Sequence, residues 1–352
     1  MEGSELQATN VMRRKTAKLW RMIEPEEDLH DYSKDDESAD LLEMKVPMEH
    51  GGLRLDQALV KLLPEYSRSR LQDWIEQGMV MLNGSPATVK QKVWGGETIC
   101  VSPQIHPSEQ PYHAEDIPLD IVYEDDAIMV INKPVGLVVH PGSGNWQGTL
   151  LNALLHHAPQ LADVPRAGIV HRLDKDTSGL MVVAKTLVAQ TALVRQMQKR
   201  TVKREYLALV WGEMDYSGVV DKPIGRHPSQ RVKMAVIEGG KEAVTHYSVE
   251  ANFPSCTLVR CRLETGRTHQ IRVHLTSIGH PLVGDSVYQK GVQKCAPQLR
   301  ELLNGFPRQA LHATQLALEH PVTGEWMEFH APLPEDMEEL LDSIDEAGDG
   351  PA

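Results

Sequence analysis

HRLDKDTSGLMVVAKT, residues 171–186, places a dense group of charged and hydroxyl side chains directly before an apolar run. The run from Leu180 to Ala184 has the aliphatic composition of a buried strand. Catalytic groups often lie in a polar loop beside such a strand, because the strand holds the loop rigidly. This stretch therefore predicts a buried strand with a candidate functional loop before it.

A second polar stretch, residues 264–274 (ETGRTHQIRVH), follows another predicted strand. An acid of the first stretch and an arginine of the second could pair, which would keep the carboxylate ionised as a nucleophile or a base. Spacing alone favours a structural interpretation, in which Asp174 or Asp176 caps a turn and Arg267 is a structural ion-pair partner. The residues by themselves leave both interpretations open.

The surrounding chain mixes strands and helices without a regular βαβ repeat. Strand patterns occur at residues 117–134, 204–214 and 243–250, and helical patterns occur at residues 149–158 and 187–200. This irregular order favours an α+β domain over a doubly wound parallel sheet.

Residues 51–102 form a smaller predicted module. Apolar residues at helical spacing over 55–63 and a second helical pattern over 67–77 precede short strand patterns around an Asn-Gly turn. Arg68 and Arg70 stand at the start of the second helix. They either serve only solubility or bind RNA phosphates together with the helix N-terminus.

The ends of the chain are acidic, whereas its middle is not. Residues 1–50 hold 7 Lys/Arg and 13 Asp/Glu, and residues 335–352 hold 8 acids and no base, so the ends contribute −14 to the net charge of −13. Residues 160–235 carry 13 bases against 7 acids, which leaves RNA binding open. We expect a disordered acidic extension over 1–50, a proline-rich linker over 103–118, a main domain over 119–334 and an acidic tail from residue 335.

Several classes of function lack their sequence signals. The chain contains no GxxxxGK[ST], no GxGxxG after a strand, no HExxH and no Cys/His cluster with zinc spacing. Its apolar runs are far shorter than the ~20 residues of a membrane helix, and its start lacks the apolar region of a secretory signal. Four cysteines without a CxxC pair fit a reducing compartment. We expect a cytoplasmic protein with no metal, no cofactor and no membrane partner.

Three motifs resemble the RluA-type pseudouridine synthases. HRLDKDTSG (171–179) resembles the signature loop of this family, KREYLALV (203–210) its tyrosine motif and GRTHQIRVH (266–274) its arginine motif. The resemblance covers about residues 116–333, and residues 51–102 resemble the S4 RNA-binding domain found before the catalytic domain in some members. It implies a mixed, mainly antiparallel catalytic sheet preceded by a small α/β S4-like domain.

The resemblance also implies roles for single residues. Asp174 matches the essential catalytic aspartate, Tyr206 the tyrosine that stacks on the target base, and Arg267 the basic residue that pairs with the aspartate, while Arg172 is a further substrate-binding candidate. The reaction breaks the C1′–N1 bond of uridine, turns the base and joins C5 to C1′, so no metal or cofactor is implied. Whether Asp174 attacks the sugar or abstracts a sugar proton is not decided by the sequence.

Longer matches, which include residues 164–186 and 226–247, resemble a branch of the family that modifies helix 69 of the large-subunit (23S) rRNA. The implied partner is this rRNA or a precursor ribosomal particle, with no DNA. Three alternatives stay open. They are a sibling synthase for other rRNA uridines, an RNA-binding assembly factor with a vestigial site, and a glycosidase that pairs Asp174 with Asp176. An attached RNA-binding module argues against the glycosidase.

Overall fold

The computed structural model describes residues 41–103, 112–142, 144–230, 232–289 and 295–348. The chain divides into two compact units, residues 1–105 and 106–352.

Within residues 41–103, the first unit packs two helices on a small antiparallel sheet. The elements are β1 (Leu42–Lys45), η3 (Met48–His50), α2 (Leu55–Leu62), α3 (Arg68–Glu76), β2 (Val80–Leu82), β3 (Ser85–Pro86) and β4 (Thr98–Val101), and the sheet order is β1-β4-β2-β3. Leu59, Leu71 and Ile99 are fully buried in the shared core. Asn83 and Gly84 have positive φ angles of 52° and 78°, as a tight hairpin turn requires. The two helices and the turn confirm the predicted module.

The first unit begins earlier than predicted. Strand β1 pairs with β4 from Leu42↔Val101 to Lys45↔Thr98, and Leu42 and Met44 pack against the core. We predicted an acidic, disordered extension over residues 1–50, and this boundary is wrong for residues 42–50. The acids around β1 obscure its short alternation of apolar and charged residues, LEMK. Residues 1–40 of the predicted extension, and 104–111 of the predicted linker, lie outside the described residues.

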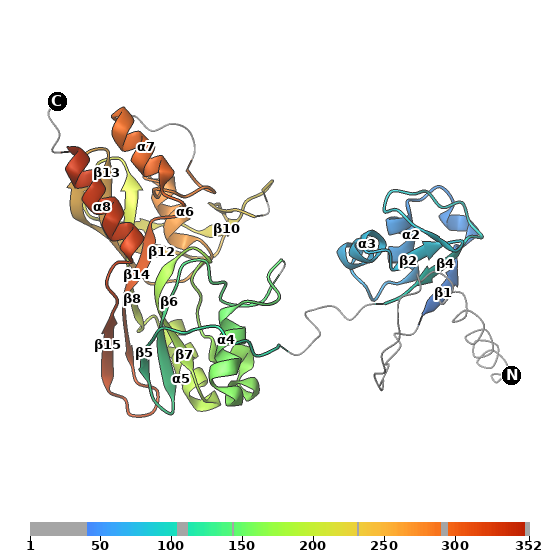
Figure 1. Ribbon diagram of the computed structural model, residues 1–352, viewed down its shortest axis with the longest axis horizontal. Helices are drawn as coiled ribbons and strands as arrows, with labels where there is room; N and C mark the ends of the chain where they lie inside the picture. The colour runs from blue at the N-terminus through green and yellow to red at the C-terminus, as the bar shows by residue number, and fades with distance from the viewer. Residues whose placement is uncertain (1–40, 104–111, 143, 231, 290–294, 349–352) are drawn as a thin grey trace, which may run out of the picture. The chain divides into compact units, whose positions relative to one another are not determined.

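A large sheet forms the second unit (Figure 1). Its strands are β5 (Ile121–Glu124), β6 (Ile128–Lys133), β7 (Ser178–Ala184), β8 (Lys203–Trp211), β9 (Gly218–Asp221), β12 (Val244–Phe253), β13 (Cys256–Leu263), β14 (Leu311–Glu319) and β15 (Trp326–His330). Their order is β5-β6-β7-β14-β8-β13-β12-β9, with β15 beside β14. The short strands β10 (Ile224–Arg226) and β11 (Met234–Val236) pair separately. Among the described strands only β7 and β14 run parallel, so the predicted mixed, mainly antiparallel α+β class is confirmed.

Helices cover both faces of this sheet. They are α4 (Leu150–His157), α5 (Leu187–Gln198), α6 (Gln270–Ser277), α7 (Pro297–Gly305) and α8 (Glu335–Gly348), with 3-10 segments η5 (Pro159–Asp163) and η6 (Pro165–Gly168). Along β8, Tyr206 and Ala208 join the core beneath α4 and α6, whereas Leu207 and Leu209 join the core beneath α7 and α8. This alternation is that of a strand buried on both faces. No helix in the described part of the chain combines the length and apolarity that crossing a membrane would need.

The acidic C-terminal segment is a docked helix. Helix α8 begins at Glu335 and buries Met337, Leu340 and Ile344 in the core beside α7 (Figure 1). We predicted an acidic tail over residues 335–352, and this prediction is wrong up to residue 348. The three apolar residues have amphipathic helical spacing, but the eight acids of the segment dominate its composition.

Candidate active site

The two polar stretches of the sequence meet at one cavity of the second unit. The cavity has a volume of about 990 Å³, and Asp174, Tyr206, Arg267 and Arg172 all line it. The sheet brings them together because the loop before β7, the first residues of β8 and the loop after β13 all border this cavity. Four of the predicted site residues therefore lie in one place, while Arg68 and Arg70 belong to the first unit.

Asp174 lies in the turn before β7, with a side chain that is 15% exposed. Its Oδ2 accepts a hydrogen bond from Arg272 Nη1 at 2.8 Å, and its Oδ1 is 3.9 Å from His269 Nε2. A hydrogen bond between a guanidinium and a carboxylate is charge-assisted, so it is stronger than one between neutral groups. The arrangement leaves Asp174 able to act as a nucleophile or a base towards a group in the cavity. The expected pairing of an acid from the first stretch with an arginine from the second is confirmed.

The arginine that pairs with Asp174 is Arg272, and the pairing we predicted for Arg267 is wrong. Arg272 is the third residue of α6 and projects from that helix towards Asp174. Arg267 precedes the helix, and its Nε donates to the Glu242 carbonyl oxygen at 3.0 Å. The change from loop to helix between the two arginines turns their side chains in different directions. Arg267 still lines the cavity, and its role in substrate binding stays a prediction.

Arg272 is held from behind by Asp285, whose side chain is completely buried. Arg272 Nε and Nη2 donate to the two Asp285 oxygens at 2.7 and 2.9 Å, and the Tyr288 ring centre lies 5.1 Å from its Cζ. Burial alone would lower the pKa of Arg272, but Asp285 and Asp174 outweigh burial and raise the pKa. We predicted no role for Arg272 or Asp285 from the sequence. Arg272 lies within the motif GRTHQIRVH, and Asp285 is the last residue of HPLVGD (residues 280–285).

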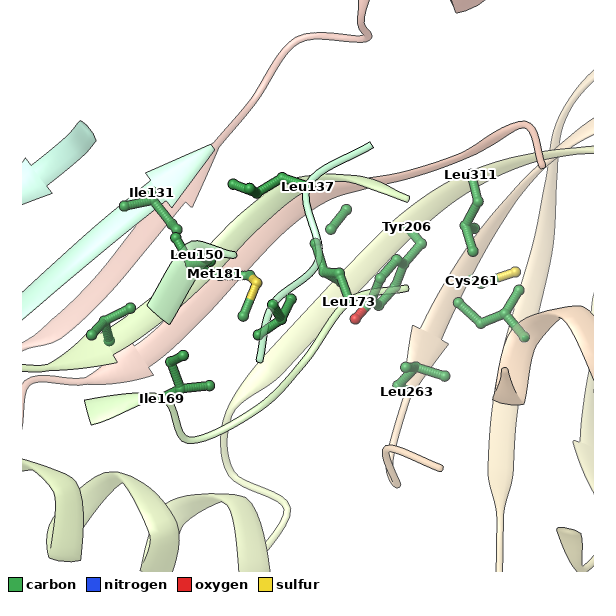
Figure 2. Packing of buried hydrophobic residues seen from close by; sticks show 14 of the residues in the cluster. Ile131, Leu137, Leu150, Ile169, Leu173, Met181, Tyr206, Cys261, Leu263 and Leu311 are labelled. Carbon is green, nitrogen blue, oxygen red and sulfur yellow. The ribbon is translucent and has the colours of Figure 1, made fainter. Parts of the chain in front are cut away.

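Tyr206 lies in β8 at the boundary between core and cavity. Its side chain is in the main core cluster, and the residue is 5% exposed. Tyr206 belongs to the same cluster of buried residues as Leu173, the residue before Asp174 (Figure 2). Burial raises the pKa of Tyr206, so the phenol stays neutral at physiological pH. A buried ring with access to a cavity can stack on a planar base, and this predicted role of Tyr206 stays a prediction.

A buried lysine supports the loop that carries Asp174. Lys133, the last residue of β6, is 1% exposed and its Nζ donates to three backbone carbonyls, including that of Lys175 at 3.0 Å. Burial lowers the pKa of Lys133 to about 7, although the charges of Asp176 and Asp174 act in the opposite direction. The contact with Lys175 ties the residue next to Asp174 to the sheet.

The cavity wall is strongly basic. Six arginines line it (Arg166, Arg172, Arg200, Arg204, Arg267 and Arg272), against two carboxylates, Asp174 and Glu264. Arg272 is paired with Asp174, and Arg200 forms ion pairs with Glu242 and Glu264 at 2.7 and 3.4 Å. The surplus of positive charge would attract a polyanion such as RNA.

The glycosidase alternative needs two carboxylates at one site. Asp174 and Asp176 lie in a turn rather than on one strand, and only Asp174 belongs to the cavity lining. The arrangement therefore gives no support to paired-carboxylate chemistry. No group of three or more His, Cys, Asp and Glu residues in the described part of the chain is placed to hold a metal ion.

Arg68 and Arg70 open helix α3 of the first unit. Arg68 Nη2 lies 2.7 Å from Oδ2 of the buried Asp56, and Arg70 Cζ lies 4.9 and 5.1 Å from the ring centres of Tyr66 and Trp74. Both arginines thus have contacts within the unit. Phosphate binding by either residue stays a prediction.

Comparison with known proteins identifies the family. Residues 127–277 match the family model described as RNA pseudouridylate synthase, and residues 53–99 match that of the S4 domain. The ribosomal large subunit pseudouridine synthase D of Nitrosomonas europaea is 59% identical over 308 residues, which cover 88% of this chain and 89% of that protein. The protein of the same name from Pasteurella multocida is 54% identical over 307 residues, or 86% and 94% of the two chains. The chain belongs to the RNA pseudouridylate synthase family.

Solved structures of pseudouridylate synthases agree with this assignment. Human RNA pseudouridylate synthase domain containing 4 has a TM-score of 0.51 at 29% identity, covering 64% of this chain and 92% of that structure. Human RNA pseudouridylate synthase domain containing 1 has a TM-score of 0.50 at 25% identity, covering 68% and 99%. The predicted isomerase activity, and the S4 domain that precedes the synthase domain, are thereby confirmed.

Proposed function

We propose that this pseudouridylate synthase acts on large-subunit rRNA, at the uridines of helix 69, and that Asp174 is its catalytic residue. The observation that carries the proposal is the pair of Asp174 with Arg272 at the wall of a basic cavity. The relatives from Nitrosomonas europaea and Pasteurella multocida are named for the large ribosomal subunit, which supports the class of substrate. The proposed partner is the rRNA, or a precursor particle that contains it, in the cytoplasm.

The residues of the cavity supply a group for each part of the reaction. As the C1′–N1 bond breaks, the Asp174 carboxylate either bonds to C1′ or removes the proton from C2′. Tyr206 stacks on the uracil that has left its helix, and Arg172 and Arg267 bind the surrounding RNA. Deuterium at C2′ of the target uridine separates the two routes, because only proton abstraction gives a primary isotope effect on turnover.

The first unit adds affinity for RNA. Arg68 and Arg70 lie at the beginning of α3, where a helix also presents free backbone amides to phosphate. Deleting residues 42–102 is expected to weaken rRNA binding and to reduce the dependence of affinity on salt, because a complex with fewer phosphate contacts releases fewer counterions. An unchanged salt dependence would assign the unit another role.

A pseudouridine map of large-subunit rRNA tests the target and the catalytic residue together. Cells that lack the gene are compared with cells that carry the wild-type copy or Asp174→Asn. We expect loss of pseudouridine in helix 69 that only the wild type restores. Loss at other uridines would assign the enzyme to the sibling specificity. Restored ribosome assembly by Asp174→Asn would favour the assembly-factor alternative as the main role.

A further inference from the structure

One largely buried arginine of the cavity has no carboxylate partner in the described part of the chain. Arg204 is 9% exposed, and its Nε has no hydrogen-bond partner among the described residues. No carboxylate in the described part of the chain lies within ion-pair distance of its guanidinium, although the other buried arginine of the cavity, Arg272, has two. A buried cation without an anion is strongly unfavourable, so a native protein that keeps one usually presents it to a ligand.

The position of Arg204 aims it at the reacting nucleotide. Arg204 precedes Tyr206 by two residues in β8, so both side chains lie on the face of the sheet that carries the cavity, and both line it together with Asp174. A Cβ atom at Gly266 would lie 2.7 Å from Arg204 Nη1, so the glycine leaves space for the guanidinium. The neighbouring ring of His171 supplies no negative charge, and burial and then the cation of Arg204 lower the pKa of His171 to about 3, so the ring stays neutral.

We infer that Arg204 binds a backbone phosphate of the RNA beside the uridine that enters the cavity. The uracil ring and the ribose are neutral, so the phosphodiester is the part of the substrate that carries a full negative charge. The planar guanidinium fork matches two phosphate oxygens. The inference rests on the proposed assignment of this cavity as the active site.

The other cavity arginines are less suited to this contact. Arg166 and Arg172 are exposed and stay hydrated when no RNA is bound, while Arg200 and Arg272 already have carboxylate partners. Arg267 is half-buried, and its Nε already donates to the Glu242 carbonyl oxygen. Among the six cavity arginines, a phosphate would therefore relieve the largest uncompensated charge at Arg204. The consequence is an unusual combination: removing the charge should leave the fold as stable or more stable while weakening the use of RNA.

Arg204→Met tests this combination, because methionine keeps an unbranched side chain and removes the charge. We expect an unchanged or higher melting temperature, and a fall in kcat/KM on a large-subunit rRNA transcript of about 10- to 100-fold, as for the loss of a charged hydrogen bond. The slope of log(kcat/KM) against log[salt] should decrease by about 0.7 to 0.9, the effect of one phosphate contact. Arg204→Lys should keep the slope and lose part of the rate.

Arg262→Met is the matched control. Arg262 is an exposed arginine of the neighbouring strand β13, and it pairs in register with Glu205, so it lies on the opposite face from Arg204. This variant should leave both rate and salt slope unchanged. A purely structural Arg204 would show itself by a lower melting temperature with a parallel loss of activity. An unchanged salt slope in Arg204→Met, with the rate reduced, would assign the contact to a neutral group such as a uracil carbonyl. Either result overturns the inference.

Synthetic RNA locates the phosphate. An uncharged methylphosphonate is placed at each linkage flanking the target uridine of a hairpin substrate. At one linkage it should slow the wild type to the level of Arg204→Met and have no further effect on that variant. Equal sensitivity of both proteins at every flanking linkage would contradict the inference. If the map places the modified uridines outside helix 69, the target proposal fails, and the same experiment is done on a hairpin containing those uridines.

Discussion

Each unit of the protein holds an aspartate against arginine, and the two pairs are built differently. In the first unit Asp56 is completely buried and accepts hydrogen bonds from Arg54, Arg68 and Gln72. Burial alone would raise the pKa of Asp56, but these hydrogen bonds outweigh burial and lower it. In the second unit Asp174 is partly exposed to a cavity, and Arg272 is the residue that donates to it.

The two aspartates are both held in place, but they differ in whether their oxygens can still accept a hydrogen bond from a ligand. The oxygens of Asp56 are occupied by donors of its own unit, so the pair can only stabilise the fold. Asp174 keeps acceptor capacity towards the cavity, and its arginine is fixed by a second acid, Asp285, on the far side. Asp285 fixes Arg272, and Arg272 in turn positions Asp174, so the Asp174 carboxylate is held in place and is still available to a substrate.

The largest expected effect is that of Asp174→Asn on turnover. An amide neither bonds to C1′ nor takes a proton, so single-turnover rates should fall about 10³-fold or more. RNA affinity should change by no more than about threefold, and the melting temperature little, because Arg272 keeps its contacts with Asp285. Activity above a tenth of the wild-type rate would show that Asp174 does not carry the chemistry.

Arg272→Lys tests whether turnover requires the guanidinium of Arg272, which donates to both Asp174 and Asp285. Lysine keeps the charge but cannot reach both acids with fixed geometry, so kcat should fall about 10²-fold with a small change in KM. The control is Arg267→Lys, which leaves the pair intact and should act mainly on KM. A greater loss of kcat in Arg267→Lys than in Arg272→Lys would contradict the structural pairing.

The sequence predicted those elements whose pattern is long and regular. Strand β7 is apolar from Leu180 to Ala184. Helices α3 and α5 begin after Ser67 and Thr186, whose hydroxyls accept hydrogen bonds from Arg70 N and Ala189 N. The predictions failed at β1 and α8, where many acidic residues hid a short periodic pattern of apolar residues. In both segments a few apolar residues among many acids determine the packing.

The sequence predicted which residues would lie together, but it did not predict the contacts between them. The motifs located Asp174 and Tyr206, and the structure places both at the cavity. We predicted the wrong arginine because the start of α6 is not visible in the sequence. The helix begins after His269, a non-glycine residue in the left-handed conformation with a φ angle of 57°, and no residue pattern predicts this conformation. Asp285 contacts Arg272 from 13 residues further along the chain, through a loop that sequence spacing does not resolve.

Asp56→Asn tests whether the ion pairs of Asp56 stabilise the first unit without affecting turnover. An amide would turn a donor towards the arginines, and the first unit should lose about 3 kcal/mol of unfolding free energy. Arg54 and Arg68 are partly exposed, so water limits the loss. Hydrogen exchange of the amides in α2 and α3 measures it, with the exposed Glu65→Gln as control. The kcat of Asp56→Asn should equal that of the wild type. Exchange that matches the wild type would mean that the ion pairs of Asp56 contribute no stability.

The smallest expected effect concerns the half-buried ring of His171, in the loop that carries Asp174. His171 Nε2 accepts a hydrogen bond from Val182 N at 3.0 Å, and its Nδ1 is buried without a partner among the described residues. Burial and then Arg204 lower the pKa of His171 from 6.5 to about 3, so the unfolded chain binds one more proton between these values. The contribution of the neutral ring to stability is therefore complete above pH 6.5 and is lost progressively as pH falls towards 3.

Between pH 7 and pH 5 the wild type should lose about 2 kcal/mol more unfolding free energy than His171→Gln, whose side chain stays neutral and can still accept from Val182. Denaturant unfolding at the two pH values measures this difference, which removes the contribution of the carboxylates that titrate in both proteins. The control is His330→Gln, because the His330 ring is 64% exposed. Parallel losses in the wild type and His171→Gln would show that the ring accepts a proton in the folded state, and that the cation of Arg204 does not suppress its charge.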